Sequence, residues 1–198
     1  VADKATVTNA ALGNLRLHLG DTLGLRQPGT FKALWVTDFP MFDAVELEDG
    51  STRWVACHHP FTAPQEQYAV SMEANPREAL AQAYDLVING HEMGGGSIRI
   101  HQPEIQERMF RILGMSEEEQ REKFGFLLDA FRFGPPPHGG LALGVDRLVM
   151  EMVGASSLRD VIAFPKTNRA QDLMLDAPGS IDAEQFEELY LESTADKN

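Results

Sequence analysis

Two acidic residues beside a predicted hairpin are the first candidates for chemistry. Asp85 and Glu92 flank the dipeptide Asn89-Gly90, which follows an apolar run and is typical of a two-residue hairpin turn. Such a turn pairs Val87 with Glu92 and places Asp85 and Glu92 diagonally on one sheet face. Carboxylates at this spacing could share a Mg²⁺ ion that also takes oxygen ligands from phosphates and water. The alternative is a solvated acidic face.

Arg99 lies further along the same predicted strand, beyond three consecutive glycines at 94–96. These glycines match neither a Walker loop nor a dinucleotide fingerprint, and glycines inside a strand indicate a bulge or a close ligand approach. Strict alternation would put Arg99 on the face opposite Glu92, whereas one bulged residue among the glycines would bring both to the same face. Without a bulge, Arg99 is an exposed charge.

A second arginine, Arg147, ends the segment GGLALGVDR at 139–147. It falls in the first turn of a predicted helix, where a cation opposes the helix dipole. This placement makes more sense if Arg147 meets a polyanion, because a guanidinium and helix-terminal N–H groups can bind phosphate oxygens together. A surface pair between Asp146 and Arg147 is the alternative.

Two histidines, His58 and His59, close a predicted strand, and Pro60 keeps His59 in an extended conformation. They could orient a carboxylate or an amine, or they could be a packed pair. No third ligand stands at a suitable spacing, and Cys57 is the single cysteine, so we predict no zinc site.

The elements that must position these residues follow from periodicity and turn signals. The acidic segment between the first two strands is expected to be a turn or loop, and 134–140, with three prolines, a loop. Helices and strands are mixed without regular strand–helix–strand alternation, which predicts an α+β fold with an antiparallel sheet flanked by helices. The predicted strands are 31–36, 53–57, 85–88, 91–100, 141–144 and 161–164, and the predicted helices are 5–25, 76–83, 103–113, 116–131, 145–153 and 183–191.

Composition bounds the class of protein. The 198 residues suffice for one main core, and no window approaches the roughly 18 apolar residues of a membrane span. We therefore expect a cytoplasmic protein with no membrane partner. With 17 Lys+Arg against 30 Asp+Glu, the net charge of −13 opposes the basic surface of a free-standing nucleic-acid binder, so any RNA contact must be local.

Six sequence blocks, in this order, resemble bacterial aspartyl-tRNA synthetases, and the likeness runs from about residue 5 to residue 180. Each block is modest evidence alone, but the six together are specific. They are WVTDFPMF (35–42), HHPFTAP (58–64), DLVINGHEMGGGSIRIH (85–101), GFLLDA (125–130), GGLALGVDR (139–147) and RDVIAFPK (159–166).

The resemblance implies a class II synthetase fold with ATP and L-aspartate bound on the sheet face. Members of this family join aspartate to ATP as aspartyl-adenylate and then pass it to the 3′ end of tRNA. By the same resemblance Gly144, Val145, Asp146 and Arg147 form the third class II motif, which binds ATP together with Glu92. Asp85 and Glu92 would hold Mg²⁺, while His58 and Arg99 would bind aspartate. No residue is assigned as catalytic in the narrower sense.

The resemblance also implies an incomplete catalytic domain. Residues 1–29 match the end of an insertion domain and the re-entry into the catalytic fold, 30–180 its C-terminal part, and 181–198 a C-terminal tail. The first two class II motifs are expected elsewhere, so the isolated chain should be inactive, and the full-length enzyme should be a homodimer. Alternatives are an asparaginyl-tRNA synthetase, an aspartate–ammonia ligase, or a non-catalytic synthetase-like module that binds a protein or senses a nucleotide.

Overall fold

The computed structural model describes residues 1–25, 27 and 29–192. It divides into two compact units, Val1–Leu148 and Val149–Asn198, and the boundary falls within helix α4 (Val145–Val153). Residues 26 and 28 of the predicted segment 1–29 and residues 193–198 of the predicted tail lie outside the described residues.

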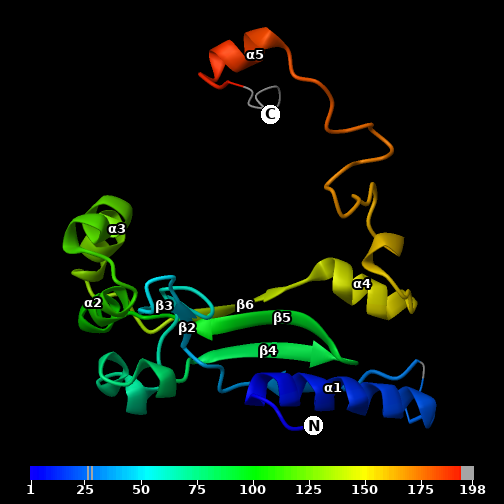
Figure 1. Cartoon of the computed structure of the whole chain (residues 1–198), viewed down its shortest axis with the longest axis horizontal. Coiled ribbons are helices and arrows are strands. Elements are labelled where there is room, and N and C mark those ends of the chain that lie inside the picture. The colour runs from blue at the N-terminus through cyan, green and yellow to red at the C-terminus, as the bar shows by residue number, and fades with distance from the viewer. Residues whose placement is uncertain (26, 28, 193–198) are drawn as a thin grey trace. The chain divides into compact units, whose positions relative to one another are not determined.

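The first unit is built on a four-stranded sheet in the order β1-β4-β5-β6, with every neighbouring pair antiparallel. Three of these strands, β4, β5 and β6, lie side by side in Figure 1. This sheet and its helices confirm the predicted α+β class. The central hairpin turns at Asn89 and Gly90, whose φ angles of 54° and 90° fit a type I′ turn. The strands are β1 (Ala33–Val36), β4 (Ala83–Ile88), β5 (His91–Ile98) and β6 (Gly139–Leu143).

A β-bulge interrupts the pairing of β4 with β5. Val87 lies opposite Glu92, but Leu86 lies opposite Gly94, so Met93 is the extra residue. The predicted bulge therefore exists, but its placement among the glycines was wrong. Gly94 to Gly96 each pair with both β4 and β6, whereas the side chain of Met93 is fully buried. The bulge reverses the alternation of faces between Glu92 and the residues that follow it.

A second, two-stranded sheet pairs β2 (Phe42–Glu46) with β3 (Thr52–Ala56). The sequence analysis expected a turn or loop where β2 forms, which was wrong for these five residues. Pairing with β3 and burial of Phe42, which is 4% exposed, outweigh the weak local pattern. Asp49 closes the connecting turn, because its Oδ1 accepts hydrogen bonds from the backbone and hydroxyl of Ser51 at 2.9 and 2.6 Å.

Two helices pack beside the main core. α2 (Pro103–Ile112) buries Gln106, Met109 and Phe110, and α3 (Glu117–Phe131) begins with a capping box formed by Ser116 and Glu119. The core cluster joins α2, α3 and both sheets. Its members are Met41, Phe42, Ala63, Met72, Ala79, Ala81, Ala83, Ile100, Met109 and Phe131.

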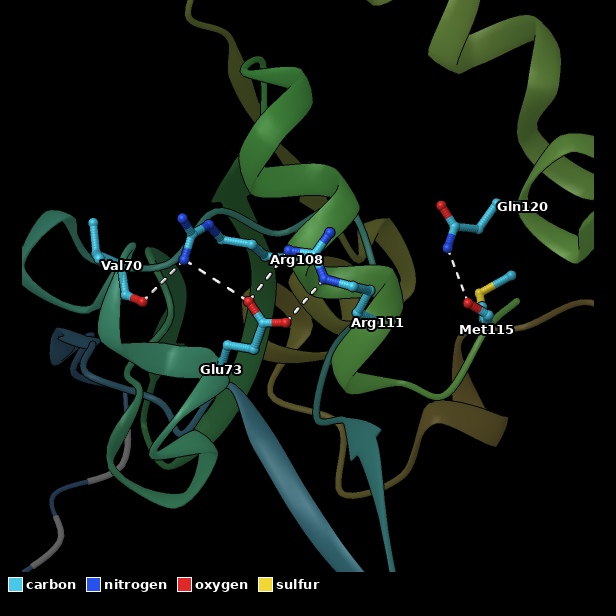
Figure 2. A network of polar contacts seen from close by, with 6 residues as sticks. All are labelled: Val70, Glu73, Arg108, Arg111, Met115 and Gln120. Carbon is cyan, nitrogen blue, oxygen red and sulfur yellow. Dashed lines mark hydrogen bonds and ion pairs between the residues drawn. The ribbon is translucent and has the colours of Figure 1, made fainter. Parts of the chain in front are cut away.

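An ion-pair network ties α2 to the short 3-10 helix Ser71–Glu73 (Figure 2). Arg111 donates to both carboxylate oxygens of Glu73 at 2.9 and 3.2 Å, while Arg108 donates to the carbonyl of Val70 at 3.2 Å. The hydrogen bonds from Arg111 hold the pKa of Glu73 below its usual value. Since these side chains are 32–49% exposed, solvent weakens the ion pairs, and the network orients the segment more than it stabilises the fold.

The helix predicted at 76–83 is reduced to a single 3-10 turn, Pro76–Glu78, and that prediction was wrong beyond residue 78. The following residues are used as extended backbone instead. Ala79 accepts a hydrogen bond from Met41, and Ala81 donates one to Phe39, which fixes the start of β4 in the core. Long-range pairing thus overrides the local helical pattern. Two further 3-10 turns are Glu66–Tyr68 and, in the second unit, Leu158–Asp160.

The remaining helices form close to where the sequence predicts them. α1 (Ala5–Thr22) has no buried residue, and α5 (Ala183–Glu188) lies in the second unit. The strand predicted at 161–164 does not form, because Phe164 has a φ of 56°, outside the extended region. Within the described residues, no helix is both long and apolar enough to span a membrane.

Candidate active site

A cavity of about 480 Å³ opens on the sheet face formed by β4, β5 and β6. The predicted site residues that line it are His58, Asp85, Glu92, Arg99, Gly144 and Arg147. Val145 and Asp146 do not line the cavity, and Val145 is 67% exposed. Side chains up to 89 positions apart in the sequence therefore line the same cavity. The β4–β5 hairpin and its bulge bring them together.

The two carboxylates stand on one face of the central hairpin. Glu92 lies opposite Val87, and Asp85 lies opposite Gly95. A Cβ atom on Gly95 would overlap Oδ1 of Asp85, so the carboxylate lies over a position where only glycine leaves room. The side chain of Asp85 therefore packs directly against the backbone of Gly95, which also lines the cavity.

Partial burial, followed by repulsion from Glu92, raises the pKa of Asp85, and nearby His58 opposes this rise. Two carboxylates in this position favour a cation that neutralises them. The described residues contain no group of three or more His, Cys, Asp or Glu side chains able to hold a metal alone. Asp85 and Glu92 could thus hold a divalent ion only with oxygen ligands from water or a substrate.

Arg147 reaches back from the start of α4 to β5. Its Nη1 donates to the backbone oxygen of Glu92 at 2.6 Å and lies 3.7 Å from Glu92 Oε2. Gly144 supports this junction, because its N–H donates to the carbonyl of Met93 at 2.7 Å. Within the described part of the chain Arg147 pairs with Glu92 and not with Asp146. The side chain of Arg147 remains 43% exposed at the cavity, so its guanidinium keeps donors for an anion.

Arg99 follows the other end of β5. Its backbone N–H donates to the carbonyl of His138 at 2.9 Å, and its guanidinium contacts His59, with Nη1 at 3.0 Å from Nδ1. Because of the bulge, Arg99 lines the same cavity as Glu92. The strand rise separates the two by roughly 20 Å. The cavity therefore offers one cation at each end, with two carboxylates near one of them, and can accept a ligand with two separated anionic groups.

The family resemblance assigns a role to His58 and none to His59. His58 lines the cavity and packs edge-on against Phe39, at 5.1 Å between ring centroids. His59 is the histidine that contacts Arg99. The adjacent position of the two histidines was the available signal, but the sequence alone could not decide which ring faces the arginine.

This sheet and cavity belong to a known class of protein. The family model described as tRNA synthetases class II (D, K and N) matches residues 15–168, and the chain belongs to this family.

Two curated relatives narrow the comparison. Over 193 residues the chain is 53% identical to the aspartate–tRNA(Asp/Asn) ligase of Geotalea uraniireducens, covering 98% of this chain and 32% of that ligase. It is also 53% identical over 192 residues to the aspartate–tRNA ligase of Macrococcus caseolyticus, covering 97% and 32%. These matches confirm the resemblance drawn from the six sequence blocks. The chain spans about a third of the length of these curated relatives.

Solved structures agree on the fold. The aspartyl-tRNA synthetase of Entamoeba histolytica superposes with a TM-score of 0.52 at 23% identity, covering 86% of this chain and 28% of that one. The asparaginyl-tRNA synthetase of the same organism, solved with asparaginyl-adenylate, gives 0.51 at 20% identity, covering 78% and 28%. At these identities the likeness establishes the class II fold and nothing finer.

Proposed function

We propose that this chain is part of the catalytic domain of an aspartate–tRNA ligase. The enzyme would activate L-aspartate with ATP to aspartyl-adenylate, release pyrophosphate, and transfer aspartate to the 3′ end of tRNA. The observation that carries the proposal is the pair of arginines, Arg99 and Arg147, at the two ends of one cavity that also holds Asp85 and Glu92. The two relatives that are 53% identical, both named as ligases for aspartate, support it.

ATP would bind at the Arg147 end. The exposed guanidinium can donate to phosphate oxygens, and Gly144 lets the backbone approach them closely. Glu92 would fix Arg147 through the existing hydrogen bond and contact the nucleotide directly or through a metal ion. Val145 and Asp146 lie outside the cavity lining, so their part in ATP binding would be to form the start of α4 from which Arg147 extends.

The carboxylates of Asp85 and Glu92 fit a Mg²⁺ ion. The raised pKa of Asp85 and its position over Gly95 both favour a cation between the two side chains. A bound Mg²⁺ would neutralise charge on the triphosphate and take its remaining ligands from phosphate oxygens and water. The role of the protein is to hold these two carboxylates on one face.

Aspartate would bind at the Arg99 end, with its side-chain carboxylate on the guanidinium and with His58 nearby. A guanidinium can donate to both carboxylate oxygens, whereas the amide of asparagine would meet it with a donor. The mismatch costs about 1–3 kcal/mol or more. Arg99 would therefore carry selectivity for aspartate over asparagine.

In the activation step an α-carboxylate oxygen of aspartate forms a bond to the α-phosphorus of ATP, and the bond from that phosphorus to pyrophosphate breaks. Both substrates are held at fixed ends of one cavity, so positioning and charge stabilisation account for the rate. A tRNA partner, a homodimeric full-length enzyme and a cytoplasmic location stay predictions that rest on the resemblance.

Three alternatives differ from this proposal in what they require. An asparaginyl-tRNA synthetase would have to bind the amide of asparagine, whereas Arg99 favours the carboxylate of aspartate. An aspartate–ammonia ligase would not need tRNA. A non-catalytic module would not need Asp85, Glu92, Arg99 and Arg147 on one cavity. The retention of all four favours an enzyme that activates aspartate.

The proposal can be tested in a hybrid enzyme in which this chain replaces the aligned 193 residues of the Geotalea uraniireducens ligase. We expect the hybrid to exchange pyrophosphate into ATP with aspartate and not with asparagine. Arg99→Leu should lower kcat/KM for aspartate by at least about 100-fold, because a charged pairing is lost. Exposed Arg121→Leu, which removes the same group from α3, is the matched control and should have no effect. Undiminished aspartate exchange by Arg99→Leu would rule out this role.

A further inference from the structure

His59 makes two contacts through one ring nitrogen. The backbone N–H of Phe61 lies 3.1 Å from His59 Nδ1, and Arg99 Nη1 lies 3.0 Å from the same atom. Backbone N–H and guanidinium N–H groups can only donate, so Nδ1 must be an unprotonated acceptor for either bond to exist. The ring is then neutral with its proton on Nε2.

The opposite ring nitrogen has a suitable partner. Nε2 lies 3.5 Å from the hydroxyl of Thr62, and that hydroxyl lies 3.4 Å from the hydroxyl of Ser97. Thr62 and Ser97 are only 2% and 4% exposed, so these groups hold fixed positions beneath the cavity. A chain of polar groups thus runs from Arg99 through His59 to the buried part of β5.

His59 and Arg99 also line a second cavity of about 390 Å³, whose other lining includes Phe61, Leu127 and Phe131. The pair therefore forms part of the wall between an apolar hollow and the proposed substrate cavity. Within the described residues, the contact with His59 is the side-chain hydrogen bond that fixes the guanidinium of Arg99.

We propose that His59 is a positioning residue for Arg99, whose guanidinium it orients through its unprotonated Nδ1 toward the side-chain carboxylate of aspartate. The inference rests on the proposed function for its substrate, but the contact between the two side chains does not. Protonation of His59 would remove both acceptor bonds and place two cations 3.0 Å apart.

The surroundings favour the neutral ring. Burial, followed by the charge of Arg99 and then His58, lowers the pKa of His59. The other titratable groups near the pair are His138, which lines the second cavity and has Nδ1 at 2.8 Å from the carbonyl of Pro136, and the carboxylates of Asp85 and Glu92, which line the first cavity. A protonated His59 would face the guanidinium of Arg99 at 3.0 Å, and the net effect of the surrounding groups is to keep the pKa of the ring below its usual value.

The first experiment reads the ring proton directly. In the 198-residue chain labelled with ¹⁵N-histidine, long-range ¹H–¹⁵N NMR distinguishes a protonated from an unprotonated Nδ1, and His59→Asn identifies the signal by its loss. We expect an unprotonated Nδ1 from about pH 6 to pH 8 and a rise in the pKa of His59 in Arg99→Leu. A proton on Nδ1 in this range would overturn the proposal.

The second experiment separates positioning from folding in the hybrid enzyme. His59→Phe keeps a ring but no acceptor and should raise KM for aspartate about tenfold to 100-fold, with KM for ATP unchanged. His59→Asn places an amide oxygen where Nδ1 stands and should stay within about threefold, while His59→Gln, whose amide lies at the Nε2 position, should resemble His59→Phe.

Equal KM values for aspartate in His59→Phe and the unsubstituted hybrid would overturn the role in recognition. If instead Arg99→Leu leaves aspartate activation intact while NMR shows the paired, neutral His59, the proposed substrate role of Arg99 fails and the contact stands. The two failures are therefore distinguishable.

Discussion

At the scale of single residues, the charges of the cavity depend on one another. Asp85 and Glu92 repel, Arg147 holds the backbone and the carboxylate of Glu92, and Arg99 relies on a neutral histidine. Each charged group is partly exposed, so each can exchange an internal partner for a ligand. Interdependent charges gathered in a cavity are typical of binding sites.

Asp85 gives a test with a defined sign. Its pKa is raised in the folded chain, so the folded state binds more protons above pH 3.8, and stability falls as pH rises through the raised pKa. Asp85→Asn should therefore raise the Tm of the ligand-free chain at neutral pH and remove any stabilisation by millimolar Mg²⁺–ATP. Thermal unfolding from pH 4 to pH 8, with and without Mg²⁺–ATP, measures both effects.

Asp49 is the matched control, since hydrogen bonds from Ser51 lower the pKa of this carboxyl. Its contribution is present above pH 3.8 and is lost as pH falls, so Asp49→Asn should lower Tm at neutral pH and leave the response to Mg²⁺–ATP unchanged. A lower Tm for Asp85→Asn at neutral pH would contradict the repulsion between Asp85 and Glu92.

At the scale of elements, α2 supports the loop that carries the two histidines. Gln106 is fully buried, and its Nε2 donates to the carbonyl of Pro60, next to His59, at 2.7 Å. Its Oε1 is the one buried side-chain polar atom without a hydrogen-bond partner among the described residues. The hydrogen bond that joins α2 to the loop therefore comes with a destabilising feature, the buried Oε1 of Gln106, which has no hydrogen-bond partner among the described residues.

Gln106→Leu removes the donor to Pro60 and the unpartnered Oε1 together. Loss of the donor destabilises the fold by about 1–3 kcal/mol, and loss of the unpartnered Oε1 stabilises it by a similar amount. The free energy of unfolding should therefore change by less than about 1 kcal/mol. Gln106→Ala also leaves a cavity and should cost about 2–4 kcal/mol more. Urea unfolding measures both variants. A loss above about 3 kcal/mol in Gln106→Leu would show that the bond to Pro60 dominates.

At the scale of the whole molecule, the edges of the main sheet are apolar and exposed. Leu34 and Trp35 of β1 are 54% and 55% exposed, and Leu141 and Leu143 of β6 are 44% and 50% exposed. Exposed apolar side chains on edge strands are typical of surfaces that are covered by another chain or by another part of the same chain. The curated relatives are about three times as long as this chain, which fits such a cover.

We expect the isolated 198-residue chain to bind the dye ANS and to self-associate with rising concentration. Leu141→Lys on β6 should reduce association, whereas Leu12→Lys on helix α1, where Leu12 is 50% exposed, should reduce it less. Sedimentation velocity over a tenfold range of concentration gives the comparison, with near-ultraviolet circular dichroism as the check that the fold is kept. A single monomeric species at every concentration would show that these edges need no cover.

The sequence by itself determined the local features of this protein. The Asn89-Gly90 turn follows from two residues that tolerate positive φ, and the capping box at Ser116 follows from two side chains three positions apart. The six blocks were enough for the family, which the match over residues 15–168 establishes. Each of these inferences uses neighbours in the chain or a complete motif.

Only the tertiary structure decided how the site residues meet. The position of the bulge at Met93, the pairing of β2 with β3 and the reach of Arg147 to Glu92 depend on partners far along the chain. The choice of His59 rather than His58 as the partner of Arg99 depends on which ring the loop turns toward β5. Contacts of this kind are set by packing and register, whose energies belong to pairs of segments, so no single stretch of sequence encodes them.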